Sequence, residues 1–185
     1  MDNNDLLYRT AIHESGHALA HYLTSGNIRD IEYIEIYKKK CTIDGLCEVT
    51  NEAGNSTAIK YNEEGGHKYW FDIFCQQVAG VCAESIIFKE PINNGYLEGD
   101  LHVFHKNTYL CQHCGLFDTD GNRNEVFANL EKDAIRYITD KFSENANIEI
   151  LKKIAQSLVA QDTIHHCKRM LSKDILPIIE NKPEN

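Results

Sequence analysis

The distribution of apolar and polar residues predicts a chain that is mainly α-helical. Residues 11–23 carry small or apolar side chains at most positions, with Asp5 available as an N-terminal cap and Gly26 as a stop, so a first helix is expected there. Residues 69–88 are apolar almost throughout and are followed by Pro91, which is typical of a long buried helix. Small residues in this second helix would let it pack closely against the first.

The second half of the chain is also expected to be helical. A turn-rich segment at residues 93–99 leads into a predicted helix that begins at Asp100 and ends near Gly115. Beyond it, amphipathic patterns predict three helices that would form a C-terminal bundle, at residues 122–143, 147–161 and 165–176.

One segment between the first two helices favours β-structure. Residues 30–51 are rich in isoleucine, tyrosine, valine and threonine, and Asp44 and Gly45 predict the turn of a β-hairpin there. The edge of this hairpin could pair with an extended peptide, or the hairpin could only cap the helices. The polar, glycine-rich residues 51–68 predict a mobile surface loop. The expected fold class is therefore mainly α, with a small β-hairpin or sheet beside the first helix.

Composition narrows the class of protein. The chain has 185 residues, of which 42% are hydrophobic and 25% charged, enough for one folded domain. Its formal net charge of -9 argues against a nucleic-acid surface, which would need clustered lysine and arginine. No apolar run approaches the ~20 residues of a membrane span, and the polar start does not resemble a signal peptide, so a cytoplasmic protein is expected. The seven cysteines are then expected to be reduced thiols.

The first predicted helix carries the candidate chemistry, in the stretch AIHESGHALAHY. His13 and His17 are four residues apart, so on a helix they share one face and their rings can converge on one ion. Glu14 is rotated round the helix and can reach a water molecule beside such an ion. This is the His-Glu-x-x-His arrangement of zinc hydrolases, with Glu14 as the general base. The alternative is a buried helix whose histidines only form hydrogen bonds, at a high cost in desolvation.

His21 continues the same spacing but is not expected to bind the same ion. A straight helix places it ~12 Å along the axis from His13, too far for both to form metal bonds near 2 Å. A third ligand must therefore come from elsewhere in the chain. Asp100, a carboxylate where the predicted loop meets the predicted helix, is a candidate because zinc accepts an oxygen ligand beside two histidines.

Three segments resemble the peptidase domain of the FtsH-type zinc proteases in their order and approximate spacing: AIHESGHALAHYL, VAGVCAESIIF and GYLEGDLHVFH. In that family a His-Glu-x-Gly-His-Ala helix is followed by an Ala-Glu helix and a Ser-Asn-Asp-Leu-like segment. The predicted C-terminal helices also look similar to the helical tail of that domain. The resemblance covers nearly the whole chain and implies a single FtsH-like zinc peptidase domain over residues 1–185, with a metal-site core at 1–121 and a helical bundle at 122–185.

The resemblance implies one catalytic zinc ion bound by three residues, His13, His17 and Asp100. It makes Glu14 the catalytic base and places Glu84 near the metal, where it would orient a ligating histidine. Two positions depart from the family pattern, since Gly99 replaces the usual asparagine before the aspartate and Ser85 replaces a second acid. Glu84 therefore stays open as the third ligand in place of Asp100.

The sequence thus predicts a zinc-dependent metalloendopeptidase that hydrolyses peptide bonds in flexible or unfolded protein segments. Family members join this domain to a membrane anchor and an ATP-driven unfolding ring, yet the chain has no G-x-x-x-x-G-K-[ST] loop. We therefore expect it to act alone, as a homo-oligomer or with a separate ATPase partner. Two alternatives remain: a peptide-binding or regulatory domain that retains the zinc site without turnover, and another single-domain zincin with Glu84 as third ligand.

A second group of residues has the composition of a structural zinc site. His102 and His105 are followed by Cys111 and Cys114, and four such ligands suit zinc. However, both pairs fall within or at the end of one predicted helix, where a closed tetrahedral site is hard to form. Surface histidines and core thiols are the simpler interpretation.

Overall fold

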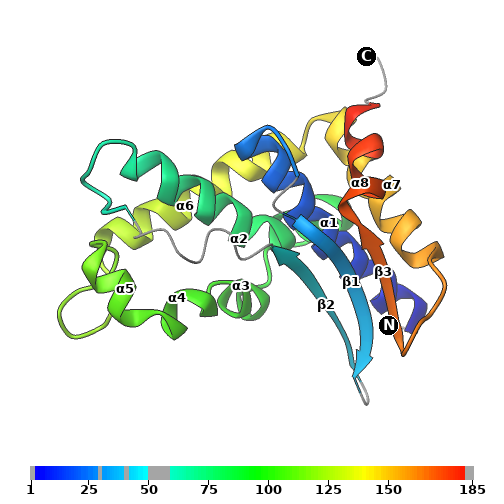
Figure 1. Ribbon diagram of the computed structural model, residues 1–185, viewed down its shortest axis with the longest axis horizontal. Coiled ribbons are helices and arrows are strands. Elements are labelled where there is room, and N and C mark those ends of the chain that lie inside the picture. The colour runs from blue at the N-terminus through cyan, green and yellow to red at the C-terminus, as the bar shows by residue number, and fades with distance from the viewer. Residues whose placement is uncertain (1–2, 29–30, 40–41, 50–58, 182–185) are drawn as a thin grey trace.

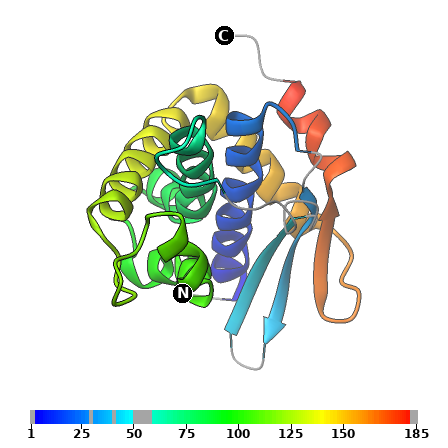
Figure 2. The same cartoon turned by 60° about the vertical axis from the view of Figure 1, so that its left-hand side comes forward.

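The computed structural model describes residues 3–28, 31–39, 42–49 and 59–181. Within these residues the protein is mainly helical with a small three-stranded antiparallel sheet, which confirms the predicted fold class (Figure 1). Helix α1 (Asn3–Ser25) lies between the sheet and helix α2 (Gly66–Phe88), and α6 (Glu125–Phe142) covers α2 on the side away from α1 (Figure 2). The helix with the His-Glu-x-x-His sequence is therefore the central element of the fold.

The ends of α1 only partly match the prediction. The helix begins at Asn3, so Asp5 is not its N-cap but lies in its first turn, where a negative charge stabilises a helix. It ends at Ser25 because Gly26 adopts a left-handed φ of 76° and its N–H donates to the carbonyl oxygen of Tyr22 (2.9 Å). The predicted stop at Gly26 is confirmed.

Close packing of α2 against α1 depends on Gly16. A Cβ atom at position 16 would overlap the carbonyl oxygen of Ala79 and the side chain of Ala83, so only glycine permits this approach. Helix α2 begins at Gly66, earlier than predicted, and ends at Phe88 as predicted. Its end is formed by Lys89, whose left-handed φ of 56° lets its N–H donate to the carbonyl oxygen of Ser85.

The sheet has the order β2-β1-β3, formed by β1 (Ile31–Lys39), β2 (Thr42–Val49) and β3 (Cys167–Leu171). The predicted hairpin of β1 and β2 is present, but its predicted turn at Asp44 and Gly45 is wrong. These two residues lie inside β2, opposite Tyr37 and Ile36, because β1 continues to Lys39 and keeps pairing. The connection of the strands falls at residues 40–41, and much of the predicted polar loop falls at 51–58; both lie outside the described residues.

Strand β3 contradicts the helix predicted at residues 165–176. Met170 is buried and lies opposite Ile34 of β1. The neighbouring Arg169 donates from Nε and Nη2 to Glu35 Oε2, at 2.9 and 2.7 Å. These contacts across 134 residues of sequence outweigh the local helical pattern, and α8 (Ser172–Glu180) begins only after the strand.

The single helix predicted from Asp100 to Gly115 is also wrong, because this segment forms three short helices, α3 (Asn94–Asp100), α4 (His102–Lys106) and α5 (Thr108–His113). The side chain of Asn93 accepts hydrogen bonds from the N–H groups of Gly95 and Tyr96, at 2.9 and 3.3 Å, and so begins a helix where turns were predicted. Asp100 is consequently the last residue of a helix, not the first.

The helices predicted at 122–143 and 147–161 are confirmed as α6 and α7 (Asn145–Ala160). Asn124 caps α6 by accepting a hydrogen bond from the N–H of Phe127 (3.1 Å). The ring of Phe127 packs against those of Phe74 and Phe104, with centroids 4.8 and 5.3 Å apart, and joins α6 to α2 and α4. Helix α7 packs against α1, so both ends of the chain contribute to one core.

By length and composition, α2 is the one described helix that could cross a membrane. Half of its most apolar stretch is buried within the protein, and the core helix of a soluble protein meets the same criteria. This is weak evidence for a span. The expected absence of a span and the cytoplasmic location both stay predictions.

Candidate metal centre

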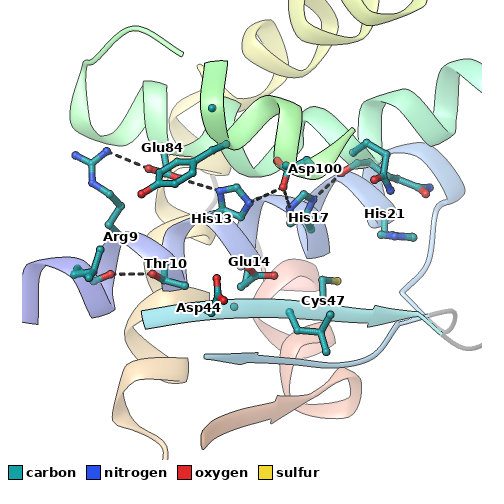
Figure 3. A pocket seen from close by; sticks show the side chains of 18 residues that line it. Arg9, Thr10, His13, Glu14, His17, His21, Asp44, Cys47, Glu84 and Asp100 are labelled. Atoms are coloured by element: carbon teal, nitrogen blue, oxygen red, sulfur yellow. Dashed lines mark hydrogen bonds and ion pairs between the residues drawn. The ribbon is translucent and has the colours of Figure 1, made fainter. Parts of the chain in front are cut away.

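Two histidines of α1 and one aspartate of α3 converge on one point (Figure 3). The Nε2 atoms of His13 and His17 lie 3.3 and 3.9 Å from Oδ1 of Asp100. The two rings are one helical turn apart, with centroids separated by 4.9 Å. The candidate ligand atoms of the three residues all lie within 4.8 Å of one another.

Hydrogen bonds on the far side of each ring determine which nitrogen faces Asp100. Nδ1 of His17 donates to the backbone carbonyl oxygen of Gln76 (2.7 Å), and Nδ1 of His13 lies 2.8 Å from Oε1 of Glu84. A neutral imidazole with its hydrogen on Nδ1 has a lone pair on Nε2. In this neutral form both histidines would present a lone pair toward the Asp100 carboxylate, as a bound metal ion would require.

Such a convergence of acceptors would require positive charge, which either a metal ion or a second proton on His13 can supply. Asp100 Oδ2 is buried and has no hydrogen-bond partner in the structure. Burial alone would lower the pKa of His13, but its hydrogen bonds to Asp100 and Glu84 raise that pKa well above its usual value. Burial lowers the pKa of His17, and the neighbouring His13 lowers it further. The donor set of two imidazoles and one carboxylate fits a divalent cation such as zinc, so this group could hold a metal ion.

Glu14 lies against the sheet, next to this group. Its side chain points toward the cleft from α1 while Asp44 faces it from β2 (Figure 3). Burial raises the pKa of Glu14 to about 8, against the opposing effect of His13, and the charges of Asp100 and Asp44 raise it further. A Cβ atom at Gly45 would overlap the Glu14 carboxyl group, so a larger residue there would force this side chain to move.

Glu84 approaches His13 from the side opposite to Asp100. Its Oε1 atom faces Nδ1 of His13, and its Oε2 atom accepts a hydrogen bond from Nη1 of Arg9 at 3.0 Å. Each oxygen of the Glu84 carboxylate thus already has a hydrogen-bond partner. Among the described residues the only group of three potential ligands is His13, His17 and Asp100, without Glu84.

A second glycine makes room for His13. We call His13, His17 and Asp100 together the metal group, because they could hold a metal ion. A Cβ atom at Gly80 of α2 would overlap the ring of His13. In the sequence, the small residues of this stretch indicate only close helix packing. Arg9 was not predicted from the sequence, although it lies four positions before His13 and so on the same face of α1. The contact of His17 with the backbone carbonyl of Gln76 could not be predicted from the sequence, because every residue has a backbone carbonyl.

A cleft of about 420 Å³ exposes the group to solvent. Its walls come from α1, α2, α3 and β2, and the five predicted site residues all line it: His13, Glu14, His17, Glu84 and Asp100. His21 also lines the cleft but is not one of the three clustered ligands, in agreement with the helix geometry. Its volume is within the range that is usual for ligand-binding clefts.

The four residues considered as a second zinc site do not form a cluster among the described residues. His102 and His105 are exposed, whereas Cys111 and Cys114 are buried. The thiol of Cys111 lies 3.4 Å from the carbonyl oxygen of Phe104, and burial raises its pKa to about 11. These residues match the interpretation as surface histidines and core thiols.

Comparisons with family models and with curated proteins found no match to the chain.

Proposed function

We propose that the protein is a zinc-dependent metalloendopeptidase that resembles the peptidase domain of FtsH-type proteases. The observation that carries the proposal is the convergence of His13 Nε2, His17 Nε2 and Asp100 Oδ1 beside Glu14 in an open cleft. A buried carboxyl group next to a potential ligand set is what hydrolysis of a peptide bond by an activated water molecule requires.

His13, His17 and Asp100 would hold the zinc ion, which, when bound, supplies a Lewis acid that polarises the scissile carbonyl and lowers the pKa of a water molecule. Glu14 would accept the proton of that water on its carboxylate and pass it to the leaving amine. Positive charge among the three ligands favours the ionised form of Glu14 that can accept this proton. Burial raises the pKa of Glu14, so its carboxyl group would hold the proton well enough to deliver it to the leaving amine.

The edge of the sheet is a candidate place for an extended substrate. Within the described strands β2 is at the edge, paired with β1 on one side, and four consecutive residues of it line the cleft: Asp44, Gly45, Leu46 and Cys47. A peptide in extended conformation could add to this edge through main-chain hydrogen bonds, which place few demands on its sequence. The substrates we propose are therefore flexible or unfolded protein segments in the cytoplasm, presented directly, by a homo-oligomer or by a separate ATPase partner.

The test is Glu14→Gln, which keeps the size of the side chain and removes the base. We expect zinc binding to persist and hydrolysis of unfolded casein to fall by about 10²- to 10⁴-fold, the usual contribution of a general base. Glu149→Gln, at an exposed glutamate of α7, is the matched control and should keep wild-type activity. Equal hydrolysis by Glu14→Gln and wild type would refute the role of Glu14. A wild type that binds zinc and casein without cleaving it would favour a peptide-binding domain instead.

A further inference from the structure

Arg9 connects the metal group to the end of α2. It lies one helical turn before His13 on α1, and its side chain is only 14% exposed. Its Nη1 atom donates to Glu84 Oε2 at 3.0 Å, and its Nη2 atom donates to Glu90 Oε2 at 2.8 Å. The guanidinium carbon of Arg9 lies 4.2 Å from the centre of the Phe88 ring, so a cation–π contact also helps to hold the guanidinium group in place.

We propose that Arg9 is a positioning residue for the metal group and acts through Glu84. The inference rests on the metal site of the proposed function, but not on hydrolysis. Arg9 holds one oxygen of Glu84, which leaves the other oxygen directed at Nδ1 of His13. This contact favours the His13 hydrogen on Nδ1, which would leave the Nε2 lone pair available to a bound metal ion. The chain of contacts runs from the surface carboxylate Glu90 through Arg9 and Glu84 to His13.

The need for Arg9 follows from the burial of Glu84. The side chain of Glu84 is only 8% exposed, so water can replace a lost partner only in part. Without Arg9 its Oε2 atom would lose its hydrogen bond in a buried place, and the carboxylate could turn away from His13 or toward the ion. Arg9 therefore also helps to keep Glu84 outside the ligand set, which separates the roles of Glu84 and Asp100.

Substrate binding is a poorer explanation of Arg9, although it lines the cleft. Its Nη1 and Nη2 atoms already donate to carboxylates, and Phe88 covers one face of the guanidinium. A substrate carboxylate would have to displace Glu84 or Glu90. The geometry thus favours an internal structural partner over an external anion.

The test is metal affinity in Arg9→Met, which keeps most of the apolar stem and removes the charge. We expect zinc, measured by competition with a chromogenic chelator, to bind about 10- to 100-fold more weakly, the usual cost of losing a residue that orients a ligand. The visible absorption spectrum of the Co²⁺ form should change as well, because the position of His13 changes. Arg169→Met is the matched control, since Arg169 also pairs with a glutamate, Glu35, and stacks on an aromatic ring, Tyr33. It should bind zinc like the wild type.

A double-mutant cycle separates positioning from general destabilisation. If Arg9 acts through Glu84, Arg9→Met combined with Glu84→Gln should bind zinc no more weakly than the weaker single variant. Arg9→Lys, which keeps the charge, should recover part of the affinity lost in Arg9→Met. Full additivity of the two losses, equal binding by the lysine and methionine variants, or wild-type zinc affinity and cobalt spectrum in Arg9→Met would each overturn the proposal.

The outcome is distinguishable from failure of the proposed function because the Arg9 variants are judged by zinc affinity, whereas the peptidase proposal is judged by casein hydrolysis. A wild type that binds zinc but cleaves nothing would overturn the peptidase proposal and leave the role of Arg9 standing. Unchanged zinc affinity in Arg9→Met, together with casein hydrolysis by the wild type, would overturn the role of Arg9 and leave the peptidase proposal standing. A wild type that binds no divalent metal would overturn both.

Discussion

His13 and His17 present the same ring nitrogen to Asp100 because each has its other nitrogen engaged elsewhere. Their partners differ in kind, since His17 donates to a backbone carbonyl while His13 faces a carboxylate that is itself held by Arg9. The backbone partner cannot be removed by a side-chain substitution, so His17 is the more firmly fixed of the two candidate ligands. The orientation of His13 depends on side chains and is open to mutation.

The two acids beside His13 should differ in their effect on zinc affinity. Asp100→Ala removes an oxygen directed at Nε2 of both histidines, and we expect zinc binding to be lost. Glu84→Ala removes a partner of Nδ1 and should only weaken binding, by about 10- to 100-fold. Competition with a chelator measures both. The opposite order of losses would make Glu84 the third ligand and refute the assignment of Asp100.

At the scale of elements, the contact between α1 and α2 places the histidines, and Gly16 sets how close it is. A Cβ atom at this position would lie 2.5 Å from the carbonyl oxygen of Ala79, in a place where neither backbone can easily move. Gly80, one residue further along α2, in turn leaves room for the His13 ring. Helix packing and the metal group therefore depend on the same short interface.

We expect Gly16→Ala to lower the free energy of unfolding by about 1–3 kcal/mol, the usual cost of overpacking, despite the higher helix propensity of alanine. Urea denaturation followed by circular dichroism measures this change. Gly99→Ala is the matched control, because a Cβ atom there meets nothing within 4 Å in helix α3. Its stability should stay the same or rise slightly. Similar stabilities of the two variants would contradict the close contact of α1 and α2.

The elements that the sequence predicted well are those whose pattern is local. The spacing of His13 and His17 within one helix was sufficient to predict that their rings converge, and α2, α6 and α7 follow from their apolar periodicity. Strand β3 could not be predicted in this way, because Met170 and Arg169 are in a strand only through their partners on β1. The place of Asp100 at the end of α3 depends on a cap at Asn93 that resembled an ordinary turn.

At the scale of the whole molecule, one core is built around α1, with the sheet on one side and α2 on the other. Cysteines fill part of this core as small apolar side chains. Among the described cysteines all are free thiols, and Cys75, Cys82, Cys111 and Cys114 are buried, whereas Cys47 and Cys167 are partly exposed. Fold stability of the described core therefore rests on packing, without cross-links between these residues.

The buried thiols should be unreactive while the protein is folded. Burial raises the pKa values of Cys75 and Cys82 to about 12 and that of Cys111 to about 11, so at pH 8 very little of the reactive thiolate is present. Treatment with iodoacetamide at pH 8, followed by peptide mass spectrometry, should leave these three unmodified in the native protein and modify them in urea. Rapid modification of any of the three under native conditions would contradict the described core.

The metal content of the purified protein tests the central claim most directly. Elemental analysis by plasma mass spectrometry, after equilibration with zinc at neutral pH and removal of the free ion, should find one zinc ion per wild-type chain. His17→Ala should retain none, because one of the three converging donors is lost. A wild-type chain that neither contains zinc nor takes it up under these conditions would contradict the metal centre, and with it the proposed peptidase.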